Sequence, residues 1–157
     1  MDETLLQQGF TPQSLSSTQY YELDENGFTI LENIITPAWL DRLRQAFEEL
    51  VEQEGEKAGV EAGQMKGVRR LADLVNKGEV FDAVYLQPAL LTAVLHIFQR
   101  PFKLSSLNGH DPLPNDGLQP LHSDNGQPTT PEGPFCIVNS MWMLDDFTID
   151  NGATRII

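Results

Sequence analysis

The sequence predicts an α+β fold, in which helices lie on one face of a largely antiparallel sheet. Before Pro101, apolar residues recur at helical spacing; after it, short apolar stretches alternate with turns rich in proline, glycine, asparagine and aspartate. Helices followed by strands are the element order of an α+β domain. The 157 residues have the length of one domain that can bury a core.

The first residues lack the periodicity of either element. Residues 1–18 are rich in glutamine, serine and threonine, which is typical of a loose tail. We therefore divide the chain into a tail, residues 1–18, and one domain, residues 19–157. Within the domain, Gly27 precedes an apolar run, residues 28–31, that predicts a short strand.

Two amphipathic helices are predicted next. Thr36 and Pro37 are a favourable N-cap and first helical residue, an apolar stripe follows, and Gly55 is a plausible stop. The stripe consists of Leu40, Leu43, Phe47, Leu50 and Val51. A second helix is expected from Pro88, burying Leu90, Leu91, Val94, Leu95 and Phe98, with His96 partly exposed. Between them we expect a surface connection and a solvated helix face that carries Lys66, Arg69 and Arg70.

The rest of the chain predicts strands separated by turns. Strands are expected at residues 102–108, 118–124, 135–144 and 153–157, with turns at 111–117, 126–134 and 150–152. In the strand 135–144, alternate residues face opposite sides. Val138, Trp142 and Leu144 suit packing against the helices, and Asn139, Met141 and Met143 would then line a pocket.

Composition excludes several classes of partner. A net charge of −13 argues against binding to nucleic acid or to an anionic membrane. The first twenty residues are polar rather than signal-like, and the longest apolar stretch, residues 90–98, is too short to span a bilayer. Cys136 is the only cysteine, so an intrachain disulfide is impossible, and it lies in an apolar run that predicts a buried thiol. We expect a cytoplasmic protein.

The sharpest chemical signal is the run Leu121-His122-Ser123-Asp124. If it lies on a strand, His122 and Asp124 point to the same face, because side chains two residues apart in a strand do so. An imidazole nitrogen and a carboxylate oxygen are two of the three ligand types in the facial triad of non-haem iron(II) oxygenases. A bare His-x-Asp also recurs by chance, and a surface turn is the competing interpretation.

Several short runs around this motif occur in an order that resembles the phytanoyl-CoA dioxygenase family, from about residue 22 to the last residue. The runs are Gly27-Phe28-Thr29-Ile30-Leu31, Pro101-Phe102-Lys103-Leu104, Leu121-His122-Ser123-Asp124, Leu144-Asp145-Asp146-Phe147 and Asn151-Gly152-Ala153. The resemblance implies part of a double-stranded β-helix, a jelly-roll, with flanking N-terminal helices. It also implies an oxygenase that uses iron(II), 2-oxoglutarate and dioxygen to hydroxylate a small-molecule substrate.

The same resemblance assigns roles to four residues. His122 and Asp124 match the first two iron ligands and are the candidate catalytic residues. Asn108 matches a position that often contacts 2-oxoglutarate. Met141 falls near a position beside the co-substrate, while plain core filling is an equal interpretation of this methionine.

The family's third iron ligand is a distal histidine, and an arginine beyond it holds the 2-oxoglutarate carboxylate. Both belong to later strands than those of this sequence, so we expect a fragment that is inactive alone. We also expect it to be poorly stable or to self-associate through open sheet edges. Two alternatives stay open: a β-helix relative that serves as a non-catalytic binding or assembly module, and a small cupin-like metalloprotein that uses His110, His122 and Asp124.

Overall fold

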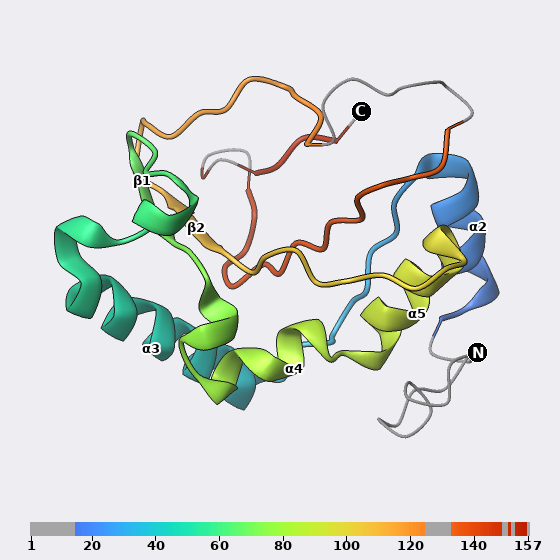
Figure 1. Cartoon of the computed structure of the whole chain (residues 1–157), viewed down its shortest axis with the longest axis horizontal. Helices are drawn as coiled ribbons and strands as arrows, with labels where there is room; N and C mark the ends of the chain where they lie inside the picture. Colours follow the sequence, from blue (N-terminus) through green and yellow to red (C-terminus); the bar gives the residue numbers. More distant parts are fainter. Residues whose placement is uncertain (1–14, 125–132, 149–150, 152, 157) are drawn as a thin grey trace. The chain divides into compact units, whose positions relative to one another are not determined.

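A computed structural model describes residues 15–124, 133–148, 151 and 153–156, and its helices and small antiparallel sheet are of the α+β class (Figure 1). The elements are α2 (Ser17–Asn26), α3 (Pro37–Glu54), the 3-10 helices η1 (Gly55–Lys57) and η2 (Val60–Ala62), β1 (Val68–Leu71), the 3-10 helices η3 (Leu74–Asn76) and η4 (Glu79–Phe81), α4 (Asp82–Tyr85), α5 (Pro88–Phe98) and β2 (Gly109–Pro112). The chain divides into two compact units, which are described in turn.

The first unit is built from the described residues of 1–34, 83–103 and 124–140. Its helices α2 and α5 pack side by side (Figure 1). The buried side chains between them are Leu15, Ala89 and Ala93, covered by Tyr20, Leu23, Leu31 and Ile34. His96 on α5 lies 2.7 Å from Asp24 on α2 and meets the edge of the Tyr20 ring. The partial exposure predicted for His96 is confirmed.

The helix α2 is a correction to the predicted tail. Ser16 accepts a hydrogen bond from the Gln19 backbone N–H, and the Gln19 side chain accepts one from the Ser16 N–H, which forms a capping box. Leu15 is buried, so residues 15–18 belong to the fold, whereas residues 1–14 lie outside the described residues. The helix has no buried residue, which explains why apolar periodicity did not predict it. Residues 28–31 form no strand.

The second unit is built from the described residues of 35–82, 104–123 and 141–157, and α3 is its longest helix. As predicted, α3 has Thr36 as its N-cap, Pro37 as its first residue and Gly55 as its C-cap. Thr36 accepts a hydrogen bond from the Trp39 N–H. Trp39, Leu43 and Phe47 are the buried side chains of the helix. They pack with a core that includes Leu71, Ala72, Leu74 and Phe81.

The helix α5 also begins and ends where the sequence predicts, at Pro88 and Phe98. The side chains it buries are Ala89, Thr92 and Ala93, and the larger residues of the predicted stripe are only partly buried. The buried Thr92 hydroxyl donates a hydrogen bond to the Pro88 carbonyl at 2.8 Å, so this polar group has a partner. The helix prediction is therefore confirmed, while its most buried face is formed by the small residues.

The sheet consists of β1 and β2, which are antiparallel, with Arg70 opposite His110 and Leu71 opposite Gly109. Leu71 is fully buried. A Cβ at position 109 would lie 2.6 Å from Cε2 of Phe47, so glycine allows α3 to approach the sheet. Two predictions are wrong here: Arg69 and Arg70 lie on a strand rather than a helix, and Asp111 and Pro112, the first residues of a predicted turn, belong to β2.

Arg69 connects three elements of the second unit. Its Nη1 and Nη2 donate to Glu48 on α3 at 2.6 and 2.9 Å, and its Nε donates to Asp111 on β2 at 2.7 Å. Its guanidinium also lies 5.6 Å from the centre of the Phe47 ring. The hydrogen bonds to Arg69 hold the pKa of Glu48 below its ordinary value.

We expect Arg69→Ala to lower the free energy of unfolding by about 1 kcal/mol, because all three hydrogen bonds end on carboxylates that are partly exposed to solvent. Urea denaturation at low and high salt measures this, and the loss should shrink as salt screens the ion pairs. Arg42→Ala is the matched control on α3, since no ion pair holds Arg42 in the described part of the chain. Equal losses in both variants would contradict the connecting role of Arg69.

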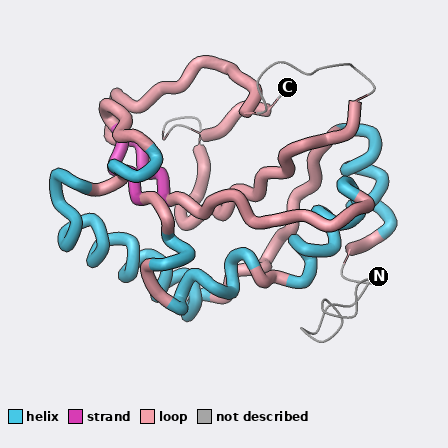
Figure 2. Tube along the Cα trace, viewed as in Figure 1, coloured by secondary structure: helices cyan, strands magenta, loops and turns pink. Residues whose placement is uncertain are grey.

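Most of the predicted strands are absent from the described residues. Residues 102–108, 118–124, 135–144 and 153–156 form no hydrogen-bonded ladder, and Figure 2 shows strand only at β1 and β2. An apolar pattern favours an extended chain, but a strand also needs a neighbour that completes its hydrogen bonds. Ile157 and most of the turns at 126–134 and 150–152 lie outside the described residues.

The alternation predicted for 138–144 is nevertheless present in the exposure of the side chains, except at Ser140, which is exposed. Val138, Trp142 and Leu144 are partly buried, whereas Asn139, Met141 and Met143 are exposed. Trp142 meets Trp39 of α3 edge to face, with ring centres 5.5 Å apart, and Arg44 of α3 hydrogen-bonds to the Leu144 carbonyl. Packing of this side of the segment against a helix is thus confirmed for Trp142, whereas Leu144 contacts α3 through its backbone carbonyl.

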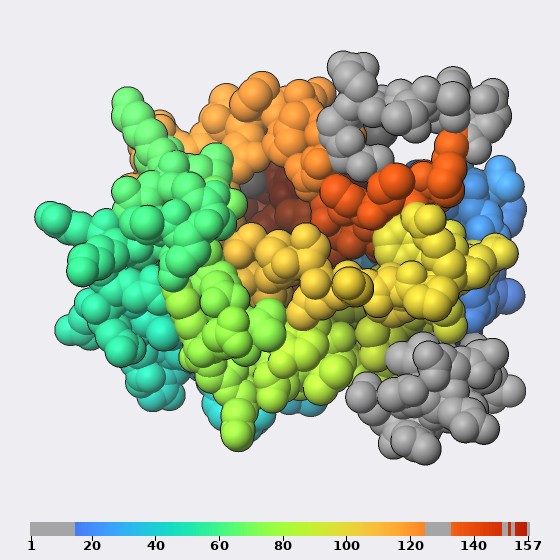
Figure 3. All heavy atoms as spheres, in the orientation of Figure 1, coloured from blue at the N-terminus to red at the C-terminus, as the bar shows by residue number. Residues whose placement is uncertain are grey.

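The described chain after residue 103 exposes several large apolar side chains. This part of the chain has the orange and red colours in Figure 3. These side chains are Leu104, Leu113, Leu118, Leu121, Phe135, Ile137, Met141, Met143, Phe147 and Ile156. Cys136 is exposed as well, which corrects the predicted buried thiol.

Among the described residues no single helix is long and apolar enough to cross a membrane, and only the bent pair Glu79–Tyr85 and Pro88–Phe98 has that length and composition when taken together.

Candidate functional site

His122 lies in the segment that follows β2, where the described chain is neither helix nor strand. Its Nδ1 is 2.8 Å from the carbonyl oxygen of Pro120. A carbonyl only accepts, so Nδ1 donates, and the neutral ring carries its lone pair on Nε2. Metal-ligating histidines commonly donate their other ring N–H in this way. The Pro120 carbonyl thus favours the neutral tautomer whose Nε2 could bind a metal ion.

Asp124 has a side-chain partner from a different part of the sequence. Its Oδ2 accepts a hydrogen bond from Nδ2 of Asn139 at 2.5 Å, within the first unit. Both residues are exposed. A neutral amide orients the carboxylate without cancelling its charge, so Asp124 keeps the anionic oxygen that a divalent cation prefers.

Asn108 and Met141 were predicted near the co-substrate. Asn108 immediately precedes β2; its Oδ1 accepts from the Asp73 N–H and its Nδ2 donates to Ser106 Oγ, both at 3.4 Å. Met141 is 51% exposed, so it does not fill a core among the described residues. None of these hydrogen bonds joins two of the four predicted site residues, and the roles of all four remain predictions.

The donor set fits part of an iron(II) site. An imidazole and a carboxylate are the expected ligand types, but a facial triad needs a third. In the described parts of the chain, no three histidine, cysteine, aspartate or glutamate side chains are arranged to hold a metal ion. The alternative set of His110, His122 and Asp124 therefore receives no support.

His110 on β2 is held in its neutral form by its surroundings. Burial lowers the pKa of His110, the opposing Arg70 lowers it further, and Asp111 offsets part of the shift. The amide nitrogen of Gln119 lies 3.4 Å from Nε2 of His110. A neutral histidine on β2, paired with Arg70 of β1, is well explained as part of the sheet.

The lowered pKa of His110 makes a prediction about pH. The unfolded chain binds this proton more readily, so the stability from neutral His110 is complete above the ordinary pKa of 6.5 and is lost as the pH falls through the folded value. We expect the melting temperature to fall between about pH 7.5 and about pH 5.5, and to fall less in His110→Gln. An NMR titration of the ring that gives a pKa at or above 6.5 would contradict this.

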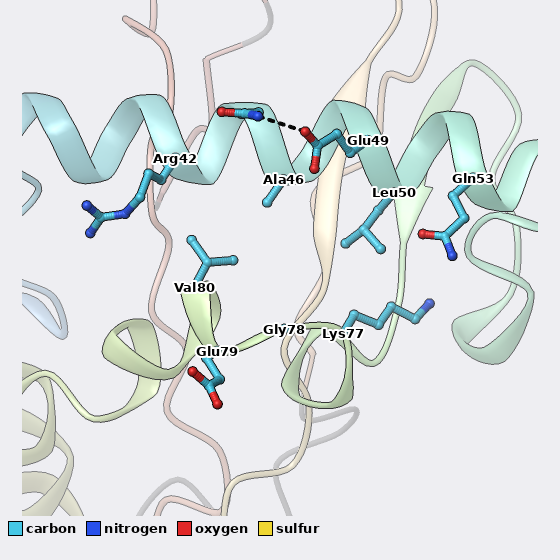
Figure 4. Close-up of a pocket in the computed structure, with 10 residues that line it drawn as sticks. Arg42, Ala46, Glu49, Leu50, Gln53, Lys77, Gly78, Glu79 and Val80 are labelled. Carbon is cyan, nitrogen blue, oxygen red and sulfur yellow. Dashed lines mark hydrogen bonds between the residues drawn. The ribbon is translucent and has the colours of Figure 1, made fainter.

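A groove of about 440 Å³ lies elsewhere in the second unit, between α3 and residues 77–80 (Figure 4). Arg42, Glu49 and Gln53 line its α3 side, and Lys77 and Glu79 line the other. Lys77 is paired with Glu54 at 2.7 Å and with Glu61 at 3.1 Å. Burial alone would lower the pKa of Lys77, but these carboxylates raise it. The groove contains none of the predicted site residues, and we assign it no chemistry.

Comparison with known proteins identifies the family. The family model for phytanoyl-CoA dioxygenase matches residues 23–157. The chain belongs to the phytanoyl-CoA dioxygenase family. The resemblance predicted from the short sequence runs is therefore confirmed.

Curated relatives of this phytanoyl-CoA dioxygenase family chain are named dioxygenases. The multifunctional dioxygenase ausE of Emericella nidulans is 25% identical over 149 residues, which are 88% of this chain and 50% of that protein. Dioxygenase trt7 of Aspergillus terreus is 28% identical, over 86% of this chain and 51% of its own length. Dioxygenase sphC of Aspergillus fumigatus is 32% identical, over 85% and 41%. The chain thus spans about half the length of these relatives, and no solved structure matches it.

The sequence did not predict that Pro120 and Asn139 hydrogen-bond to the predicted ligands. The Pro120 carbonyl is two residues before His122, a local spacing that could have suggested it. Asn139 was placed on the pocket side of its segment but was not paired with Asp124, which is 15 residues away. No pattern in a single sequence links two positions of that kind.

Proposed function

We propose that this chain supplies two iron(II) ligands, His122 and Asp124, to a 2-oxoglutarate-dependent hydroxylase of the phytanoyl-CoA dioxygenase family. The observation that carries the proposal is the donor pair: an imidazole whose Nδ1 is engaged by Pro120 and a carboxylate engaged by Asn139. Both ligand types suit non-haem iron(II) and both have the outer hydrogen bonds that such ligands use. The family of the chain and the names of its relatives support the same reaction class.

The roles of the chain's own residues follow from their chemistry. His122 would bind through Nε2, while the Pro120 carbonyl keeps the proton on Nδ1. Asp124 would bind through one carboxylate oxygen and lower the net charge of the site. Asn108 presents an amide that could hydrogen-bond a carboxylate of 2-oxoglutarate. When bound, iron(II) would activate dioxygen, the oxidant of the reaction, with one oxygen atom going to the substrate carbon and the other to 2-oxoglutarate, which would be oxidised to succinate and carbon dioxide.

We further propose that the third ligand and the arginine that holds 2-oxoglutarate are supplied from outside this sequence, as parts of a complete double-stranded β-helix. Two features support this proposal. The relatives are about twice as long as the matched segment. The described residues also contain no group of three metal-ligating side chains. The substrate would be a small molecule.

The test uses the intact protein without oxygen, loaded with iron(II). Adding 2-oxoglutarate should produce the visible charge-transfer band of the chelated co-substrate, and admitting oxygen should then release succinate. The band reports binding even if no hydroxylation substrate is present. Absence of both the band and succinate, in a protein that melts cooperatively, would reject the proposed function.

A further inference from the structure

We propose that Asn139 is a positioning residue for the metal site, and that it orients the carboxylate of Asp124 through Oδ2. This inference rests on the proposed function, because it concerns the same carboxylate. It adds a residue with a defined role, since Asn139 would not touch the metal, the co-substrate or the substrate. It would act only through the orientation of Asp124.

The contact itself has one chemical interpretation. The Asn139 amide approaches Oδ2 of Asp124 to 2.5 Å. An ionised carboxylate only accepts hydrogen bonds, so the group that faces it must be the NH₂ end of the amide, since two oxygens at that distance would repel each other. The amide therefore donates to Oδ2, and this hydrogen bond fixes the orientation of the Asp124 carboxylate.

The surroundings of Asn139 argue against a purely structural role. It is exposed, whereas the neighbouring Val138 is partly buried, so its side chain is not part of the packing of the segment. It belongs to the same exposed set as Met141, for which the family resemblance predicts a position near the co-substrate. An exposed amide that contacts a predicted metal ligand can be lost with little effect on folding.

The chemical type of the side chain also suits this positioning role. A lysine or arginine at position 139 would orient Asp124 equally well, but its positive charge would compete with the cation for the carboxylate. An amide supplies a donor and no net charge. The other predicted ligand, His122, also has an uncharged hydrogen-bond partner, the Pro120 carbonyl. Since a backbone carbonyl cannot be removed by mutation, Asn139 is the outer partner that mutagenesis can test.

The experiment measures cobalt(II) binding to the intact protein, because cobalt(II) occupies iron(II) sites, is stable in air on the experimental time scale and has visible ligand-field bands. Asn139→Leu keeps the approximate shape and removes the donor, and Asn139→Gln restores an amide. Asn76→Ala is the matched control: its Nδ2 also donates to a carboxylate, that of Asp73, at 2.9 Å. We expect about 10-fold weaker cobalt(II) binding and shifted ligand-field bands in Asn139→Leu, partial recovery in Asn139→Gln, and no change in Asn76→Ala.

The outcomes separate this inference from the proposed function. If the wild-type protein fails to bind cobalt(II), or binds it equally well after His122→Ala, the proposed function fails and the role of Asn139 fails with it. If the wild type binds and His122→Ala does not, while Asn139→Leu keeps wild-type affinity and bands, only the positioning role is overturned. If Asn139→Leu does not keep the circular dichroism spectrum of the wild type, Asn139→Ala replaces it, because alanine removes the same donor from an exposed position. Weaker cobalt(II) binding by Asn139→Ala then supports the positioning role, and wild-type binding overturns it.

Discussion

Replacing His122 with alanine should remove stoichiometric iron(II) binding by the intact protein and abolish succinate formation. Loss of an outer hydrogen-bond partner of a metal ligand costs about 10–100-fold in affinity, and loss of the ligand itself should cost more. Asp124→Ala should have a similar effect, because it removes the only carboxylate of the predicted donor pair. Isothermal titration with iron(II) under anaerobic conditions measures both losses directly.

Two further histidines make this experiment selective. His96→Ala is the matched control: His96 is engaged by Asp24 on a helix surface, and its loss should leave iron(II) affinity unchanged. His110→Ala tests the cupin-like alternative, since only that alternative makes His110 a ligand. Equal loss of binding in His110→Ala and His122→Ala would favour the alternative, and retention of binding in His122→Ala would remove the proposed ligand.

The largest effect on stability is expected for Leu71→Ala. Leu71 lies on β1, is 0% exposed and packs close to Gly109, where α3 approaches the sheet. Removing its side chain leaves a cavity between the helix and the sheet, which should lower the free energy of unfolding by about 2–5 kcal/mol. Urea denaturation of the intact protein measures this change from the shift in midpoint at constant slope.

Leu118→Ala provides the control for that measurement. Leu118 is 88% exposed, so the same chemical change removes little buried surface and should cost less than about 0.5 kcal/mol. A comparable loss in both variants would mean that the second unit does not derive its stability from the core around Leu71.

The helices could be predicted because their signals are local. Thr36, Pro37 and Gly55 identify both ends of α3 within a single stretch of sequence, and Pro88 identifies the beginning of α5. The strands could not be predicted in the same way. The partner of Arg69 on β1 is Asp111, 42 residues away, and two adjacent arginines indicate an exposed helix more readily than a strand. Pairing between distant segments is set by packing, which the pattern of one segment does not reveal.

The candidate site could also be predicted only where its signal is local. His122 and Asp124 could be proposed from a three-residue motif, and the family they indicated is confirmed. Their partners depend on tertiary placement: Asn139 reaches Asp124 across 15 residues, and only coordinates bring the two together. The alternation of exposure along residues 138–144 could be predicted in part, because a period of two is visible in the sequence even where no hydrogen-bonded ladder forms.

The contact between Trp39 and Trp142 gives the second unit an optical reporter of its own. They are the two tryptophans of this chain, and their rings lie 5.5 Å apart at 67°. At that separation the two indoles exchange excitation energy, so emission and near-ultraviolet circular dichroism depend on whether the segment around Trp142 is seated on α3. The tryptophan fluorescence of this chain therefore reports on one identified contact. It can measure the rate at which the segment around Trp142 packs on α3 during folding, without an added label.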